Sequence, residues 1–196
     1  MYSIKGGNML GWISKVWDVN DSLPAHADVI ALISYGAVPG AVTNGSLWTA
    51  IHANRLRRKY PNAKIIFGVF SKNPPGAEEE QKILPLCPKS FCVGPVSSST
   101  DECEAILKAA SDAKSIIVVA EGWHSRRLKL VWKHFFKGEL CFKSVPGDAC
   151  ADPRNPMWMQ RYSLVWMLIN MFFTPLYKFF PGVDWFAKQN FSQPAN

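Results

Sequence analysis

Ser115–Ala120 reads SIIVVA, an unbroken apolar run followed by the polar segment Glu121–Ser125. A short run rich in β-branched residues is typical of a strand with both faces covered. Such strands occur in parallel sheets, where the crossover helices pack on the two faces. The stretch therefore predicts a central strand of an α/β domain.

Strand-like and helix-like segments alternate on both sides of this run. Further strands are predicted at Asp28–Ser34, Lys64–Val69, Ser90–Val93 and Leu140–Val145. Helix patterns separate them: one capped by Ser46, an acidic start at Glu78–Glu80, one over Thr100–Ala110 and one capped by Ser125. We expect a doubly wound, mostly parallel, Rossmann-like sheet joined by right-handed crossovers.

The chain divides into three regions. Residues 1–24 are expected to form a lead-in helix with Leu10, Ile13, Val16 and Trp17 on one face. Residues 25–150 form the α/β domain, and residues 151–196 an aromatic helical extension that packs on it.

The net charge, the cysteines and the absence of known motifs limit the classes of function that the sequence supports. A formal net charge of +7 suits an anionic ligand or a membrane surface. The basic residues fall in short clusters within helix patterns, which argues against a nucleic-acid partner. The five cysteines form no CxxC pair, which predicts reduced thiols in the cytoplasm and no metal site. G-x-G-x-x-G, G-x-S-x-G and P-loop motifs are absent from the sequence.

Ligands of open α/β sheets bind at the carboxyl ends of the strands, so four loops are candidates for the site. They are Ser34–Ser46, Phe70–Ala77, Val96–Thr100 and Glu121–Ser125. The glycine-rich first loop leads into a helix N-terminus, which binds phosphate or carboxylate, although its glycines also suit an ordinary turn. Hydroxyls near Thr100 suit either an anion pocket or helix caps.

Glu121, His124 and Arg127 follow the central strand at spacings of three. His124 is a candidate general acid or base, or a hydrogen-bond donor, and Arg127 is a candidate fork for carboxylate or phosphate. The alternative is a capping histidine and a solvated arginine on an exposed turn.

The order of these motifs resembles the ElyC/SanA/YdcF family, a domain of unknown function, over roughly Ala27 to Asp148. Ser97, Thr100 and Glu102 occupy the S-x-N-T-x-E-N-like positions, with Ser99 and Cys103 where asparagines are usual. Trp123, His124 and Arg127 fill an aromatic-His-x-x-Arg motif. Arg55 stands where the family has a helix arginine, and Glu79 (or Glu78) where it has an acidic residue. The first turn reads SYGAVPG, which departs from the usual run of glycines.

The resemblance implies a Rossmann-like domain with a polar pocket, connected with the bacterial cell envelope. Its ligand would be nucleotide-like or phosphorylated, S-adenosylmethionine being one suggestion. His124 would be the acid, base or donor, and Arg127 and Arg55 would clamp the anion. Glu79 and Glu102 would orient the ligand, and Ser34, Gly36, Ser97 and Thr100 would bind it. We expect the side chains of His124, Arg127, Thr100 and Glu79 to converge with the Ser34–Gly40 backbone on one concavity at the carboxyl edge of the sheet.

Between Arg161 and Lys178 the sequence YSLVWMLINMFFTPLY carries no charge. We expect a helix over Tyr162–Phe173 with its apolar face hidden and a wetter side bearing Gln160, Ser163, Asn170 and Thr174. Packing across the sheet is favoured over an interfacial membrane helix.

Two functions are left open. One is a small-ligand pocket protein of envelope metabolism, catalytic or not, located in the cytoplasm. The other is a non-catalytic, membrane-peripheral sensor anchored through residues 157–186.

Overall fold

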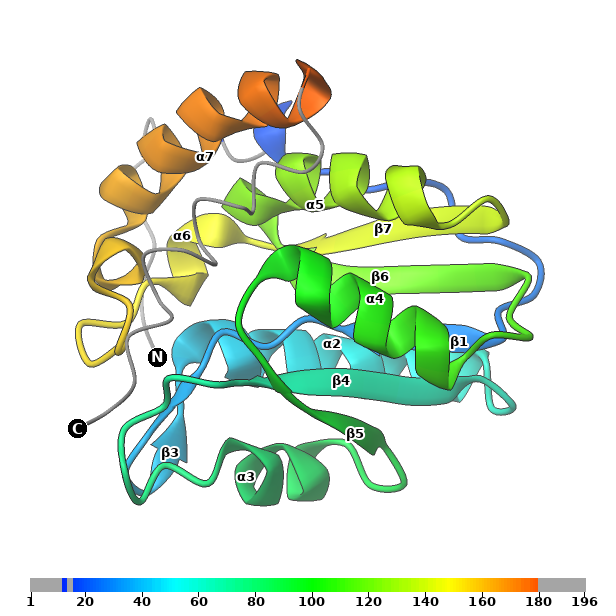
Figure 1. Cartoon of the computed structure of the whole chain (residues 1–196), viewed down its shortest axis with the longest axis horizontal. Coiled ribbons are helices and arrows are strands. Elements are labelled where there is room, and N and C mark those ends of the chain that lie inside the picture. Colours follow the sequence, from blue (N-terminus) through cyan, green and yellow to red (C-terminus); the bar gives the residue numbers. More distant parts are fainter. Residues whose placement is uncertain (1–11, 14–15, 180–196) are drawn as a thin grey trace.

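The computed structural model describes residues 12–13 and 16–179, and its centre is a five-stranded parallel sheet (Figure 1). The strands lie in the order β5-β4-β1-β6-β7. Their bounds are β1 Val29–Leu32, β4 Lys64–Phe70, β5 Phe91–Val96, β6 Ser115–Glu121 and β7 Glu139–Val145. The predicted α/β class is confirmed, and Ser115–Ala120 lies in β6, an interior strand between β1 and β7. β1 pairs with β4 on one side and β6 on the other, so the chain changes direction across the sheet at β1.

Helices cover both faces of the sheet, as the apolar strands require. α2 (Asn44–Lys59) and α3 (Glu79–Leu86) pack through Ala50, Ala53 and Ile83 on one face. α4 (Ser99–Ala109) and α5 (Gly122–Phe135) pack through Ile106 and Trp132 on the other. The side chains of the strands therefore contribute to two hydrophobic cores, one on each side of the sheet.

Several predicted helix starts are wrong by one or more residues. α2 begins at Asn44 with Thr43 as its cap, so Ser46 lies inside the helix. α4 is capped by Ser98. α5 begins at Gly122, directly after β6, and Ser125 does not cap it. α4 and α5 begin early because the chain turns from strand to helix almost at once after β5 and β6, whereas the β2–β3 hairpin lies between β1 and α2. The predicted strand Ser90–Val93 likewise extends to Val96.

A short hairpin and three helical segments complete the described chain. β2 (Ala37–Val38) pairs antiparallel with β3 (Ala41–Val42) within the glycine-rich loop after β1. After β7 come α6 (Gly147–Cys150), the 3-10 helix η1 (Trp158–Arg161) and α7 (Ser163–Phe179). α7 runs alongside α5 beyond the sheet, and its Phe173 and Tyr177 join the core that α5 covers (Figure 1).

The predicted orientation of α7 is wrong. Asn170 and Gln160, expected on the wetter side, are 0% and 4% exposed, whereas Phe172 is 68% exposed. Trp166 is buried as expected and Met167 is buried as well, but Leu168, also expected to be hidden, is more than half exposed. Trp166, Asn170, Phe173 and Tyr177 share the inner face because the pocket and α5 lie there. The inner side of α7 is thus partly polar, and its outer side is apolar.

The lead-in segment packs beside α7. Ile13 and Trp17 contact the cluster of Trp123, Trp166 and Met167, while Val16 is exposed, contrary to the prediction. Leu10 and residues 180–186 of the predicted membrane-contacting segment lie outside the described residues. Of the helices that the structure describes, none has the length and apolarity to cross a bilayer.

Candidate ligand-binding site at the carboxyl edge of the sheet

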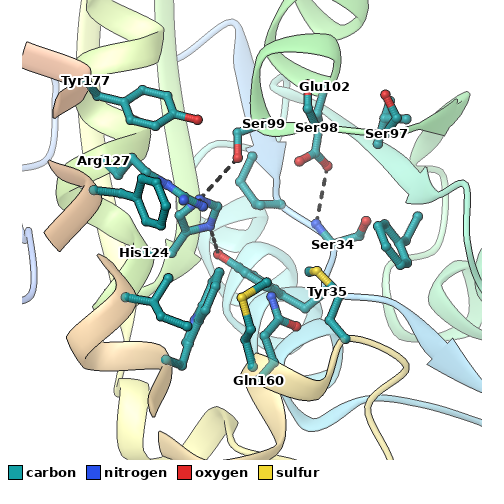
Figure 2. Close-up of a pocket in the computed structure, with 18 residues that line it drawn as sticks. Ser34, Tyr35, Ser97, Ser98, Ser99, Glu102, His124, Arg127, Gln160 and Tyr177 are labelled. Atoms are coloured by element: carbon teal, nitrogen blue, oxygen red, sulfur yellow. Dashed lines mark hydrogen bonds between the residues drawn. The ribbon is translucent and has the colours of Figure 1, made fainter. Parts of the chain in front are cut away.

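A cavity of about 320 Å³ opens where β1, β5 and β6 end. This position is the one expected for ligands of doubly wound sheets, beside the strand at which the chain reverses its direction across the sheet. Pockets for small molecules span roughly 300–1,000 Å³, so the cavity lies at the small end of that range. Figure 2 shows its side chains converging from both sheet and helices.

The cavity has a polar floor and largely apolar walls. Polar groups come from the loops after β1 and β5 and from α4, α5 and η1: Ser34, Tyr35, Ser97, Ser98, Ser99, Glu102, His124, Arg127 and Gln160. The walls are mostly from η1, its preceding loop and α7: Met157, Met159, Trp166, Ile169, Phe173 and Tyr177, with Ile33, Phe70 and Val96. The extension after β7 therefore builds one side of the site.

His124 lies at the centre of the polar floor, in the first turn of α5 (Figure 2). Its Nε2 is 2.7 Å from an Arg127 guanidinium nitrogen and 3.1 Å from Ser99 Oγ. Burial, reinforced by the charge of Arg127, holds the pKa of His124 well below its ordinary value. Because a guanidinium can only donate, Nε2 must carry the lone pair and Nδ1 the proton. His124 is therefore neutral and receives the Arg127 hydrogen bond.

Tyr35 supports His124 from the opposite side. Its hydroxyl oxygen lies 3.3 Å from His124 Nδ1 and accepts the backbone N–H of Glu121 at 2.9 Å. The two rings meet edge to face, with centroids 5.8 Å apart. Tyr35 itself is fixed because its backbone N–H donates to Ser46 Oγ at 2.7 Å. Ser46, predicted as a helix cap, thus holds the loop that places Tyr35.

Arg127 lies one helical turn after His124 and faces aromatic rings. Its guanidinium carbon is 5.6 Å from the ring centre of Trp166 and 5.4 Å from that of Tyr177, within cation–π range. Its Nε is buried and has no hydrogen-bond partner. Within residues 12–13 and 16–179, no carboxylate forms an ion pair with Arg127. Its positive charge is consequently not neutralised by the part of the protein described.

Two carboxyl groups, Glu102 in α4 and Glu121 at the end of β6, are buried at this edge of the sheet. Burial raises the pKa of Glu102 to about 8, with the nearby Glu79 adding to the effect. Burial likewise raises the pKa of Glu121 to about 8, despite a hydrogen bond from Trp166 Nε1 at 2.8 Å. Both groups are mainly protonated at pH 7, so neither carries a full negative charge. Glu102 lines the cavity and accepts the Ser34 N–H at 3.3 Å.

The structure brings together five of the nine predicted site residues: Ser34, Ser97, Glu102, His124 and Arg127 line the cavity. Gly36, Arg55, Glu79 and Thr100 do not. Arg55 is exposed on α2, away from the cavity lining. Thr100 is buried in the first turn of α4, beside Ser99. The expected convergence of Thr100 and Glu79 with His124 on one concavity is therefore wrong for these two residues.

Glu79 is a structural residue of the loop. Its Oε1 accepts hydrogen bonds from Gly36 N at 2.9 Å and Ser46 Oγ at 3.0 Å. Its Oε2 accepts from Phe70 N at 2.8 Å and Asn73 Nδ2 at 2.7 Å. Four donors occupy this buried carboxylate, and burial nevertheless raises its pKa. The amide that the glycine-rich loop was predicted to offer a ligand is thus taken by Glu79.

The N-terminus of α2 is occupied in the same way. Asp152 Oδ2 accepts the Asn44 N–H at 3.1 Å and is itself paired with Arg154 at 2.9 Å. An anion from the protein therefore fills the place where the sequence predicted a ligand phosphate or carboxylate. The ligand site lies instead against α4 and α5.

Sequence reasoning did not single out Tyr35, Gln160, Trp166 or Tyr177 as site residues. Tyr35 directly follows the predicted strand Asp28–Ser34 within a loop already identified as a candidate, so its position was a usable signal. The residues of η1 and α7 carried no such signal, because their approach to the cavity depends on tertiary packing.

Metal binding finds no support among the described residues, where no group of three or more His, Cys, Asp or Glu side chains could hold an ion.

The chemistry that the site can perform depends on Arg127 and His124. Arg127 can bind an anion, and a neutral His124 can receive the Ser99 hydroxyl proton when Arg127 bonds elsewhere. The five cysteines are all unpaired thiols.

Fold and site together define a Rossmann-like α/β protein whose pocket, with a polar floor and apolar walls, lies at the reversal point of its sheet. Comparison of the chain with models of known families, with curated proteins and with solved structures finds no match.

Proposed function

We propose that the chain is a small-ligand-binding protein of the ElyC/SanA/YdcF type, whose pocket takes a phosphorylated or nucleotide-like anion. The observation that carries the proposal is Arg127, a pocket-lining cation with a buried, unpartnered Nε and no ion pair among the described residues. A buried donor without a partner is unfavourable, and a ligand phosphate or carboxylate would satisfy it. The motif resemblance adds the expected link to the cell envelope.

The electrostatics of the pocket support an anion. With Glu102 mainly protonated at pH 7, Arg127 dominates the charge inside the cavity. The N-terminal ends of α4 and α5 both reach the cavity through Ser99 and His124, and helix N-termini carry partial positive charge. A protonated Glu102 can also donate a hydrogen bond to a ligand oxygen.

The walls support a ligand with a flat apolar part. Phe70, Trp166, Phe173 and Tyr177 all line the cavity, and aromatic side chains favour stacked or edge contacts with other rings. A phosphate on Arg127 with a ring against these walls is the arrangement that a nucleotide-like ligand would adopt.

His124 acts in this proposal as the residue that positions Arg127, because its Nε2 receives the Arg127 hydrogen bond. A catalytic step would begin only when the ligand anion takes over that bond. His124 Nε2 would then be available to Ser99, whose hydroxyl lies 3.1 Å away.

A thermal-shift screen of nucleotides, S-adenosylmethionine and sugar phosphates tests the proposal. A ligand present at a hundred times its Kd adds about 2.7 kcal/mol of stability. Arg127→Lys should lose most of this gain, because lysine offers a point charge in place of a planar fork. Arg55→Lys, on the exposed surface of α2, is the matched control and should leave binding unchanged.

An anionic ligand that binds Arg127→Lys as tightly as the wild type would contradict the assignment of Arg127. A screen in which only neutral or cationic compounds bind would contradict the anion class itself.

A further inference from the structure

The outer face of α7 is an exposed apolar stripe. Leu168, Phe172 and Phe179 are 54%, 68% and 71% exposed. Leu164, Met171 and Pro175 are exposed as well, and the spacings of three and four place all six on one side of the helix. Soluble proteins rarely leave such a continuous apolar surface uncovered.

More exposed aromatic residues precede α7 in the chain. Trp158 in η1 is 61% exposed and Tyr162 is 62% exposed. The lead-in segment packs against α7 through Ile13 and Trp17, and its Trp12 is 68% exposed. Tryptophan and tyrosine are the residues that gather where lipid headgroups meet acyl chains.

The charge of this region distinguishes two partners that could cover the outer face of α7, a second copy of the chain and an anionic lipid surface. Residues 153–179 contain no Asp or Glu, and Arg161 and Lys178 are exposed near the two ends of the stripe. A symmetric dimer through α7 would bring these like charges toward one another. An anionic lipid surface attracts them, at about 1 kcal/mol for each basic residue near the surface.

We propose that α7 docks lengthwise in the interface of an anionic lipid bilayer, with the stripe of Leu164, Leu168, Met171, Phe172, Pro175 and Phe179 toward the acyl chains. The helix has 17 residues. At 1.5 Å per residue it is about 25 Å long, which suits a helix lying in the interface. Its inner face keeps its contacts with α5 and the pocket. This inference does not depend on what the pocket binds.

Vesicle flotation of the full chain tests the proposal. The vesicles are pure phosphatidylcholine or phosphatidylcholine with about one third phosphatidylglycerol, whose negative charge attracts basic segments. The wild type should float with the anionic vesicles and be released as salt rises. Leu168→Glu/Phe172→Glu should lower binding at least about tenfold, because it places two charges on the buried face.

Three comparisons make the result specific. Trp48→Glu, at a residue 41% exposed on α2, is the matched control and should float like the wild type. Lys178→Gln keeps the apolar stripe and should lower binding about fivefold. Melting temperatures of all variants check folding, and neither Leu168 nor Phe172 lines the pocket.

Three outcomes would overturn the proposal. A monomer that ignores anionic vesicles would show that lipid does not cover the face. A stable dimer without flotation would assign the face to a second copy. Flotation of the double glutamate variant equal to that of the wild type would place lipid contact elsewhere on the molecule.

Discussion

The ionisation of Glu102 provides a direct test of whether burial raises the pKa of a carboxyl group in the pocket. Its pKa is about 8 in the folded protein, against an ordinary value of 4.5. The folded state therefore holds a proton that the unfolded chain releases as soon as the pH exceeds 4.5. The stability linked to this proton is fully present below the unfolded pKa, is lost as pH rises, and stops falling above the folded pKa.

The magnitude follows from that difference in pKa. Between the two values, one such group lowers the free energy of unfolding by about 1.4 kcal/mol for each pH unit. At pH 7 the accumulated loss is about 3 kcal/mol. Glu102→Gln keeps an acceptor for the Ser34 N–H but cannot ionise, so the variant should escape this loss.

Urea unfolding between about pH 5 and pH 8 measures the effect, because the slope of stability against pH counts the protons exchanged on unfolding. Glu102→Gln should have a slope shallower than the wild type by one proton. Glu104→Gln, exposed on the same helix, should follow the wild-type curve. Parallel curves for the wild type and Glu102→Gln would show that Glu102 ionises normally and would refute the argument.

Two further predictions concern the residues that support the site. Trp166→Phe keeps the aromatic wall but removes the N–H donor 2.8 Å from Glu121 Oε2, and should cost about 1–3 kcal/mol in urea unfolding. Trp158→Phe, at a residue 61% exposed, is its control, and equal losses would contradict the role of the hydrogen bond. Gly45→Ala places a Cβ 2.9 Å from Tyr35 Cβ, so it should destabilise by about 1–3 kcal/mol and weaken ligand binding by displacing Tyr35. Unchanged stability and binding would mean that Tyr35 is not held by this contact.

The fold could be predicted from local pattern because each strand had to be buried on both faces. Ser115–Ala120 requires helices above and below it, and the alternation of elements supplies them. The order β5-β4-β1-β6-β7 could not be predicted, because pairing between strands leaves no mark on the hydrophobic pattern of either one.

The residues of the site that are placed by the sheet topology alone could be predicted from the sequence. His124 and Arg127 follow a strand end, and the carboxyl edge of a parallel sheet brings such residues together. Glu79 also lies near that edge, but its four hydrogen bonds to loop donors depend on the fold of the β1–α2 loop. A carboxylate needed to satisfy buried amides and one needed to bind a ligand have the same sequence signature.

α7 shows the limit of periodicity most clearly. The expected hidden face held Trp166 and Phe173 together with Leu168 and Phe172, but the first two lie on the inner side and the last two on the exposed outer side. Which face is covered depends on the neighbours, and here the partly polar side meets α5 and the cavity. Asn170 is only half satisfied there, because its Nδ2 donates to the Trp166 carbonyl at 2.9 Å while its buried Oδ1 has no partner among the described residues.

The wall that η1 and α7 give the cavity has a consequence for the order of assembly. All five strands of the sheet have been synthesised once Val145 leaves the ribosome, whereas Trp166, Phe173 and Tyr177 emerge later. Because chains fold from the N-terminus as they are made, the sheet can form around an open groove before the wall arrives. Ligand binding is then acquired only after the wall has emerged, and a chain truncated after α6 would carry His124 and Arg127 without an enclosed place for a ligand.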